Sequence, residues 1–295
     1  MNNVLFKQYN PDVLKKLQMV QTEMLKDVLE VCEKYELPCF LIYGTAIGAV
    51  RHKGFIPWDD DIDVILMRDE YLKLMDVLKN DNDGRYKLLS IYNSKDYYYP
   101  FAKLVDSHTV LTENSKKING MGIYIDIVPM DGYPDSNTLK HISNVRIIRN
   151  LMVRRFRIKN CIRDKFDYMS FTKEKVKFKL FKDLIYSFID YVTLPFGYNF
   201  WVKIFDKEIS KYDIHKCDYI GVRTGNFGVR EAFLKEDIIE QDLYEFEGMK
   251  FTSFKNYDLY LRRKFGDYEK DPEESQKVTH HQYEAYWKWY YEWFN

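Results

Sequence analysis

Residues 56–66 have the sequence IPWDDDIDVIL, in which four acids within five positions run directly into an apolar segment. Residues 61–66 are predicted to form a short buried β-strand, because the segment is rich in β-branched side chains. Like charges this close raise one another's pKa and oppose folding unless a cation offsets them. Residues two apart on a strand face the same side, so Asp61 and Asp63 would project together. Converging carboxylate oxygens suit Mg²⁺ or Mn²⁺.

A third carboxylate is expected from Asp126, in the segment 122–128, GIYIDIV. A lone acid inside a β-branched segment is unusual as a solvated surface residue. If its strand lies beside that of Asp61 and Asp63, three carboxylates meet at one edge of the sheet. Two metal ions there could clamp a nucleotide diphosphate and stabilise both the attacking and the leaving oxygens. Asp61, Asp63 and Asp126 are therefore the predicted metal ligands and catalytic residues.

The segments around the acidic strand predict an α+β fold. Residues 11–36 carry apolar side chains three and four apart, which is typical of an amphipathic helix, and Pro38 ends it. Residues 39–43 predict a buried strand that Gly44 and Thr45 break, followed by a short helical turn at 46–50. The further elements expected are a helix at 68–79 and strands at 86–92, 101–105 and 122–128. This order does not form a regular βαβ array and favours a mixed sheet flanked by helices.

Charge is unevenly distributed along a chain whose net charge is zero. Residues 146–182 hold thirteen Lys or Arg against three Asp or Glu, so this segment carries +10 and the rest of the chain −10. The overall balance predicts no nucleic-acid partner. Two interpretations of the basic segment stay open, a solvated helix face or a surface that attracts an anionic acceptor or the inner leaflet of a membrane. We divide the chain into a catalytic core at 1–138, a basic helical lobe at 139–215 and a C-terminal part at 216–295.

Cysteine usage and hydropathy predict a cytoplasmic protein, in peripheral contact with the inner face of the membrane if the basic segment binds there. The four cysteines have no CxxC spacing, which favours a reducing compartment over a zinc site or a disulfide scaffold. No apolar segment of useful length follows the start, so no signal peptide is expected. The aromatic tail at 271–295 is predicted to be a docked helix, with membrane-interface anchoring as the alternative.

Other interpretations of the acidic segment use different chemistry. A glycosyltransferase also uses Asp-x-Asp to hold a sugar nucleotide through a metal ion. A calcium loop would match acids at Asp59, Asp61 and Asp63, but Val64 occupies the position where that loop needs glycine. A solvated acidic turn fits the apolar continuation badly. A non-catalytic binding module would be favoured if Asp126 lay remote from Asp61.

Two blocks beside the acidic strand, 43–51 (YGTAIGAVR) and 54–64 (GFIPWDDDIDV), closely resemble the LicD family. The resemblance spans nearly the whole chain, matches least in the basic middle, and continues at 100–106, 125–132, 246–248, 260–261, 265–268 and 280–281. This family includes bacterial phosphocholine transferases and the fukutin-type phosphoribitol transferases. The chain departs from the family pattern after Gly248, where a Pro is missing, and at Asp271-Pro272, where the family has a Pro pair.

The resemblance implies a nucleotidyltransferase-like core that acts on a CDP-alcohol with a divalent metal ion. Carried over to this sequence, Gly44 and Thr45 lie in the turn that approaches the donor phosphates, Asp61 and Asp63 bind metal, and Asp126 is the third acid. The expected reaction is attack by a glycan hydroxyl on the phosphorus that bears choline, with CMP leaving. The expected acceptor is a cell-surface or lipid-linked glycan or a teichoic acid precursor. CDP-ribitol and CDP-glycerol are the alternative donors, and sequence does not separate a basic from a metal-binding role for Asp126.

Four further side chains are candidate donor contacts, namely Arg51, Lys103, His280 and Trp58. Arg51 is a candidate for the phosphates, and pairing with Asp59 or Asp60 is the alternative. Lys103 is a second candidate, against an internal ion pair within its strand. His280 is a third, against a surface position. Trp58 is the first candidate for contact with the quaternary ammonium of choline, which aromatic faces bind.

Overall fold

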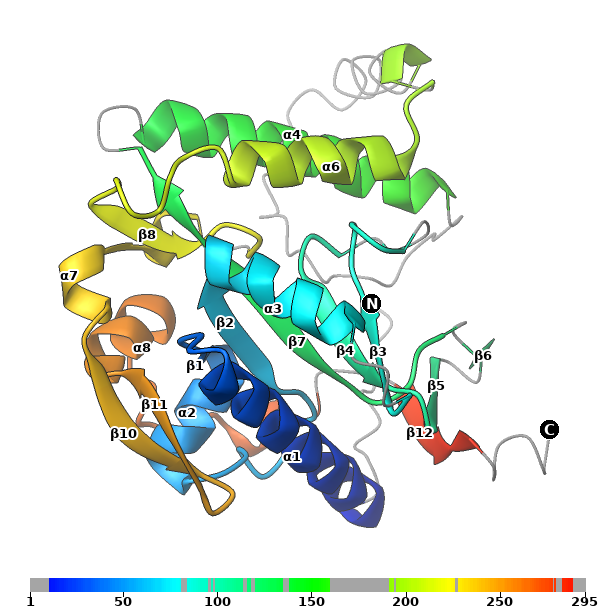
Figure 1. The fold of residues 1–295 in the computed structure, drawn as a ribbon, viewed down its shortest axis with the longest axis vertical. Coiled ribbons are helices and arrows are strands. Elements are labelled where there is room, and N and C mark those ends of the chain that lie inside the picture. Colours follow the sequence, from blue (N-terminus) through cyan, green and yellow to red (C-terminus); the bar gives the residue numbers. More distant parts are fainter. Residues whose placement is uncertain are drawn as a thin grey trace.

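The computed structural model describes residues 11–80, 84–94, 97, 99–113, 116–117, 120–134, 138–159, 191–193, 195–225, 228–277, 279 and 283–288. A mixed sheet forms its centre, with strand order β1–β2–β7–β4–β3 and with β8 and β9 continuing from β7 (Figure 1). The strands are β1 (Phe40–Leu41), β2 (Asp63–Met67), β3 (Tyr86–Leu89), β4 (Ala102–Asp106), β7 (Tyr124–Tyr133), β8 (Tyr219–Val222) and β9 (Ala232–Leu234). The predicted mixed sheet flanked by helices is confirmed.

Strand β7 is the centre of this sheet because both of its halves are paired. Its first half runs parallel to β2 and antiparallel to β4. Its second half runs antiparallel to β8, and every residue of β7 is buried. The strand predicted at 122–128 therefore extends to Tyr133, since β8 supplies hydrogen-bond partners for backbone groups that would otherwise lack them.

Helices α1 (Pro11–Lys34) and α3 (Arg68–Asn80) cover one face of the sheet. Their apolar residues are spaced three and four apart and join Val64, Leu66 and Ile127 in one buried core. Each fully buried aliphatic side chain contributes about 1.5–3 kcal/mol. The helices predicted at 11–36 and 68–79 are confirmed.

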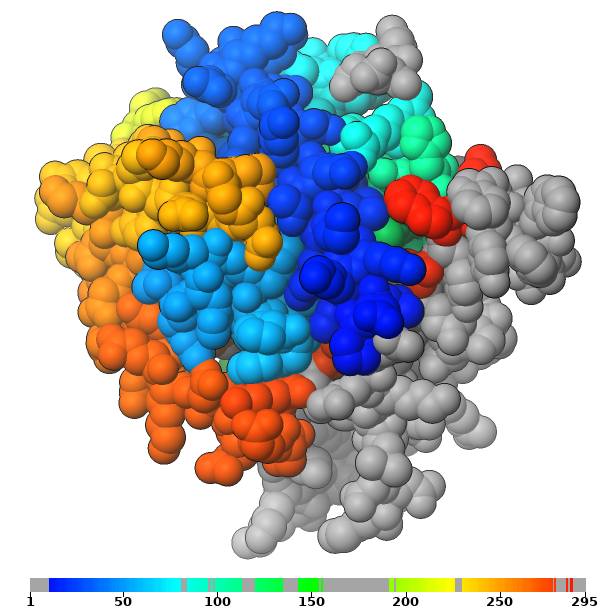
Figure 2. Space-filling model, turned by 90° about the horizontal axis from the view of Figure 1, so that it is seen from below, coloured from blue at the N-terminus to red at the C-terminus, as the bar shows by residue number. Residues whose placement is uncertain are grey.

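The opposite face of the sheet packs on helix α8 (Tyr257–Phe265) and on a hairpin of β10 (Gln241–Phe246) and β11 (Met249–Phe254). Helix α2 (Tyr43–His52) lies against this hairpin, and Figure 2 shows α1, α2 and the hairpin side by side on one surface. The short turn expected at 46–50 is instead a helix that already includes Gly44 and Thr45. Short segments complete this region: η1 (Gly228–Glu231), α7 (Lys235–Ile238) and η2 (Glu274–Gln276).

Two long helices, α4 (Thr138–Lys159) and α6 (Tyr198–Ile209), lie side by side beyond the C-terminal end of β7 (Figure 1). Arg68 ties α6 to the sheet, because its guanidinium donates to both Asp131 oxygens at 2.7 Å and to Asp206 at 3.0 Å. Residues 146–159 of the basic segment belong to α4 and are helical, and residues 160–190 lie outside the described residues. The division of the chain at 139 and 215 stays a prediction.

The aromatic tail differs from the prediction of a docked helix, which is wrong for residues 283–287. These residues form strand β12 (Tyr283–Trp287), which pairs antiparallel with β5 (Thr109–Glu113), and β5 also pairs with β6 (Lys116–Lys117). Aromatic side chains favour the pleated geometry of a strand, and β5 offers an edge for pairing. In the part of the chain that is described, no helix has the length and apolar content needed to cross a membrane.

Candidate functional site

The backbone of the acidic segment is held by two glutamines of α1. The Gln18 amide donates to the carbonyl of Asp59 at 2.9 Å. The buried Gln21 amide donates to the carbonyl of Asp60 at 3.1 Å and to that of Tyr124 at 3.0 Å. The start of β7 and the acidic segment are therefore anchored to the same helix.

Three consecutive carboxylates converge in front of β2. Among the described residues, Asp59, Asp60 and Asp61 each place one carboxylate oxygen so that all three lie within 4.8 Å of one another. Asp59 and Asp60 are buried, and Asp61 is half-buried. Burial, followed by the charges of Asp61 and Asp60, raises the pKa of Asp59 well above its usual value. Asp59 and Asp60 were not among the predicted metal ligands, although they belong to the same group of four acids in five positions as Asp61 and Asp63.

Asp63 and Asp126 face each other across the parallel strands β2 and β7, as partners in the strand register. Burial first, then the charges of Asp61 and Asp126, raise the pKa of Asp63. The predicted juxtaposition of the two strands is therefore confirmed, and Asp63 interacts electrostatically with both Asp61 and Asp126. Asp126 is not remote from the acidic segment, which removes the reason to favour a non-catalytic binding module.

Lys103 of β4 forms an internal ion pair with Asp126. The two residues are cross-strand partners, their Nζ and Oδ1 atoms are 2.5 Å apart, and their side chains are 2% and 5% exposed. The Lys103 ammonium also lies 3.5 Å from the centroid of the Tyr124 ring. Of the two roles expected for Lys103, a donor contact or an internal ion pair, the structure shows the ion pair. Its positive charge offsets part of the negative charge around Asp63.

Gly44 and Thr45 lie in the first turn of α2, directly against the acidic segment. A Cβ atom on Gly44 would lie 2.4 Å from the Asp59 carboxylate, so a side chain there would displace that carboxylate. The Thr45 hydroxyl accepts a hydrogen bond from the backbone N–H of Asp63 at 2.9 Å. This turn therefore sets the start of β2, and the N-terminus of a helix is an end that favours anions.

Two other predicted donor contacts, Arg51 of α2 and Trp58, have partners of their own. Arg51 donates to the carbonyl of Tyr268 at 3.2 Å and forms an ion pair with Asp271, rather than with Asp59 or Asp60. Trp58 is half-buried, and the Lys277 ammonium lies 5.2 Å from the centroid of its ring. A cation therefore already rests near this aromatic ring. His280 lies outside the described residues.

A second buried ion pair beside Asp63 was not predicted. Lys264 of α8 contacts both Glu231 oxygens, at 2.8 and 2.7 Å, and the two side chains are 0% and 1% exposed. Burial lowers the pKa of Lys264 to about 8, while the charges of Glu231 and Asp63 act in the opposite direction. Lys264 follows two arginines on the same short helix, so its local sequence resembles a solvated basic face.

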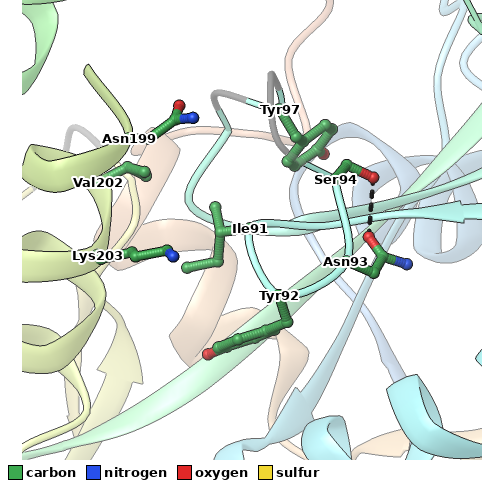
Figure 3. Close-up of a pocket in the computed structure, with 8 residues that line it drawn as sticks. All are labelled: Ile91, Tyr92, Asn93, Ser94, Tyr97, Asn199, Val202 and Lys203. Atoms are coloured by element: carbon green, nitrogen blue, oxygen red, sulfur yellow. Dashed lines mark hydrogen bonds between the residues drawn. The ribbon is translucent and has the colours of Figure 1, made fainter. Parts of the chain in front are cut away.

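A cavity of about 270 Å³ lies apart from the carboxylates, between the segment after β3 and helix α6 (Figure 3). It is lined by Ile91, Tyr92, Asn93, Ser94, Tyr97, Asn199, Val202 and Lys203. None of the predicted site residues lines it. The carboxylate site is built on strand and helix ends instead.

A strand-borne carboxylate cluster beside a Gly-Thr helix N-terminus is an arrangement suited to a transferase acting on a nucleotide substrate. The family model described as "LicD/FKTN/FKRP, nucleotidyltransferase domain" matches residues 36–178, a range that includes Gly44, Asp63 and Asp126.

Similarity to known proteins extends over almost the whole chain. The chain is 31% identical over 280 residues to the lipopolysaccharide cholinephosphotransferase LicD of Haemophilus influenzae, covering 92% of this chain and 97% of the relative. An uncharacterized protein of Rickettsia prowazekii is 30% identical over 131 residues, covering 44% of this chain and 45% of its own. This chain belongs to the LicD family and is a transferase.

Proposed function

We propose that the protein transfers phosphocholine from CDP-choline to a hydroxyl of a glycan, with release of CMP, in a reaction that requires Mg²⁺ or Mn²⁺. The observation that carries this proposal is the register of Asp63 with Asp126 beside the cluster of Asp59, Asp60 and Asp61. The choice of phosphocholine and of a glycan acceptor follows the named activity of the Haemophilus influenzae relative.

The carboxylates fit a divalent cation on chemical grounds. The oxygens of Asp59, Asp60 and Asp61 are hard ligands that lie within 4.8 Å of one another, and burial together with neighbouring negative charge raises the pKa of both Asp59 and Asp63. Asp61 and Asp63 would hold the metal, with Asp126 as the third acid. Bound there, the metal would supply Lewis-acid neutralisation of the diphosphate and of the leaving CMP.

The residues of the chain itself position the reactants. Gly44 leaves room for the Asp59 carboxylate beside the N-terminus of α2, and Thr45 holds the backbone of Asp63. The acceptor oxygen forms a bond to the phosphorus that bears choline, and the bond from that phosphorus to the CMP oxygen breaks. Asp126, oriented by Lys103, takes the acceptor proton in this scheme. Positioning and charge stabilisation supply most of the rate.

The test incubates the purified protein and a glycan acceptor with CDP-choline, CDP-ribitol, CDP-glycerol or UDP-sugars, each with and without Mg²⁺, and measures CMP release from the CDP-alcohols and UDP release from the UDP-sugars. We expect CDP-choline to be the preferred donor, and Asp61→Asn and Asp63→Asn to abolish turnover without loss of the fold. The control is Asp242→Asn, because Asp242 is an exposed acid on β10. Full activity of either site variant would refute the proposal. A preference for UDP-sugars would identify a glycosyltransferase instead.

A further inference from the structure

The unpredicted ion pair of Lys264 and Glu231 surrounds a residue with an unusual backbone conformation, Tyr43. Tyr43 has a positive φ of 54°, which bulky L-residues rarely adopt. The Lys264 ammonium lies 3.4 Å from the centroid of the Tyr43 ring. The Tyr43 hydroxyl donates to Glu231 Oε1 at 3.4 Å, and its backbone N–H donates to the Tyr260 hydroxyl at 3.5 Å. The conformation of Tyr43 is therefore held by contacts from η1 and α8.

The packing around this group leaves little space for rearrangement. A Cβ atom on Gly225 would lie 2.8 Å from Glu231 Oε1 and 2.9 Å from the Tyr43 hydroxyl, so the backbone itself closes one side. The carbonyl of Gly225 accepts a hydrogen bond from Arg149 of α4 at 2.7 Å. Helix α4 of the basic segment is thereby linked to the same group.

Tyr43 directly precedes the Gly44–Thr45 turn. The orientation of Tyr43 consequently sets the position of Thr45, whose hydroxyl accepts the Asp63 N–H. A buried ion pair is weak support for stability, because the desolvation of two charges offsets their attraction. The pair at Lys264 and Glu231 is therefore better explained by the conformation that it enforces than by a gain in stability. Strained backbone of this kind persists where the surroundings over-determine it.

We infer that Lys264 and Glu231 are positioning residues that hold Tyr43 in its left-handed conformation and so fix the turn that presents Asp63 to the donor. Neither side chain contacts the reacting atoms in this arrangement. The part of the inference that concerns the donor rests on the proposed function, whereas the part that concerns the turn does not.

The test replaces the pair by apolar residues of similar size, Lys264→Met with Glu231→Leu, since such replacements are often neutral or stabilising. We expect the melting temperature to be retained while hydrogen exchange of the amides at 43–46 becomes faster. The kcat/KM for CDP-choline should fall by up to about 100-fold, the order expected when a remote change misplaces a reacting group. The fall should appear mainly in kcat, because the bound donor is misaligned.

The matched control is Arg262→Met with Glu269→Leu, which removes an exposed ion pair between the same helix and a residue beyond its C-terminus. It should leave both the exchange at 43–46 and the turnover unchanged. Unchanged exchange and unchanged kcat/KM in the Lys264 and Glu231 variant would overturn the inference. If that variant does not fold, hydrogen exchange at 43–46 and kcat/KM are measured on Tyr43→Phe instead, which removes the hydroxyl contact to Glu231. If the unmodified protein does not release CMP from CDP-choline, the proposed donor is wrong. The hydrogen exchange at 43–46 then tests the positioning role by itself.

Discussion

Individual residues of the site are constrained by close contacts, and Gly44, which packs against the Asp59 carboxylate, is the clearest case. We predict that Gly44→Ala lowers turnover severely, because the new methyl group collides with the Asp59 carboxylate and displaces it from the other acids. Metal affinity, measured by titration calorimetry with Mg²⁺, should fall in the same variant. Gly197→Ala is the control, since a Cβ atom there meets nothing within 4 Å. Equal activity of both variants would show that the Gly44–Asp59 contact is unimportant.

Lys264 also predicts a pH dependence of stability at the residue scale. Its folded-state pKa, about 8, is below its usual value of 10.5, so the unfolded chain binds more protons between these two values. Stability therefore rises with pH across this window. The difference in unfolding free energy between the unmodified protein and the Lys264→Met, Glu231→Leu variant should increase by about 3 kcal/mol from pH 8 to pH 10.5. Urea unfolding at each pH measures it, and a difference that stays constant or shrinks would contradict the buried, desolvated state of Lys264.

The same residue shows where prediction from sequence ends. Asp61, Asp63 and Asp126 were predictable because charge inside an apolar, β-branched segment conflicts with its surroundings in the sequence itself. Lys264 sits among basic neighbours on a short helix, where the local pattern indicates solvent. Its burial depends on η1 and α2, which are distant in sequence, so no local signal marks it.

At the scale of elements, hydrophobic periodicity predicted α1, α3, β2 and β7, because each carries one continuous buried face. It did not predict the β10–β11 hairpin or β12. The exposed residues of β10 outnumber its buried ones, and β12 depends on an edge strand far away in the sequence. Periodicity therefore identifies elements that pack centrally, and it misses those that pair at the margins.

Helix α1 has a second role at this scale, since it also fixes the acidic segment. We predict that Gln21→Leu destabilises the protein by about 1–3 kcal/mol, because the carbonyls of Asp60 and Tyr124 lose their donor in a buried position. Urea unfolding measures this loss, and the Mg²⁺-induced rise in melting temperature should shrink in parallel. Lys26→Gln, on the exposed side of the same helix, should change stability by less than about 1 kcal/mol. If Gln21→Leu leaves the Mg²⁺-induced rise in melting temperature unchanged, α1 does not support metal binding by the acidic segment.

At the scale of the whole molecule, one charged network joins helix α6 to the sheet. Arg68 bridges Asp131 of β7 and Asp206 of α6, and the Tyr92 hydroxyl donates to Asp206 at 2.7 Å. The network lies at the opposite end of β2 from the acidic segment. Strand β2 thus begins at Asp63, directly after the acidic segment, and ends at Met67, directly before Arg68 and the connection to α6.

This arrangement predicts a regional effect of Arg68→Met. The change leaves two carboxylates without their guanidinium in a mostly buried place, which should cost about 3–5 kcal/mol. Because α6 is tied to the sheet through this residue, its amides should gain hydrogen exchange more than those of α1, whose packing does not involve Arg68. Exchange mass spectrometry of the variant compares the two helices directly. Equal increases in both would mean that α6 and the sheet unfold as one cooperative unit regardless of the network. A selective increase in α6 would assign to Arg68 the coupling between α6 and the sheet.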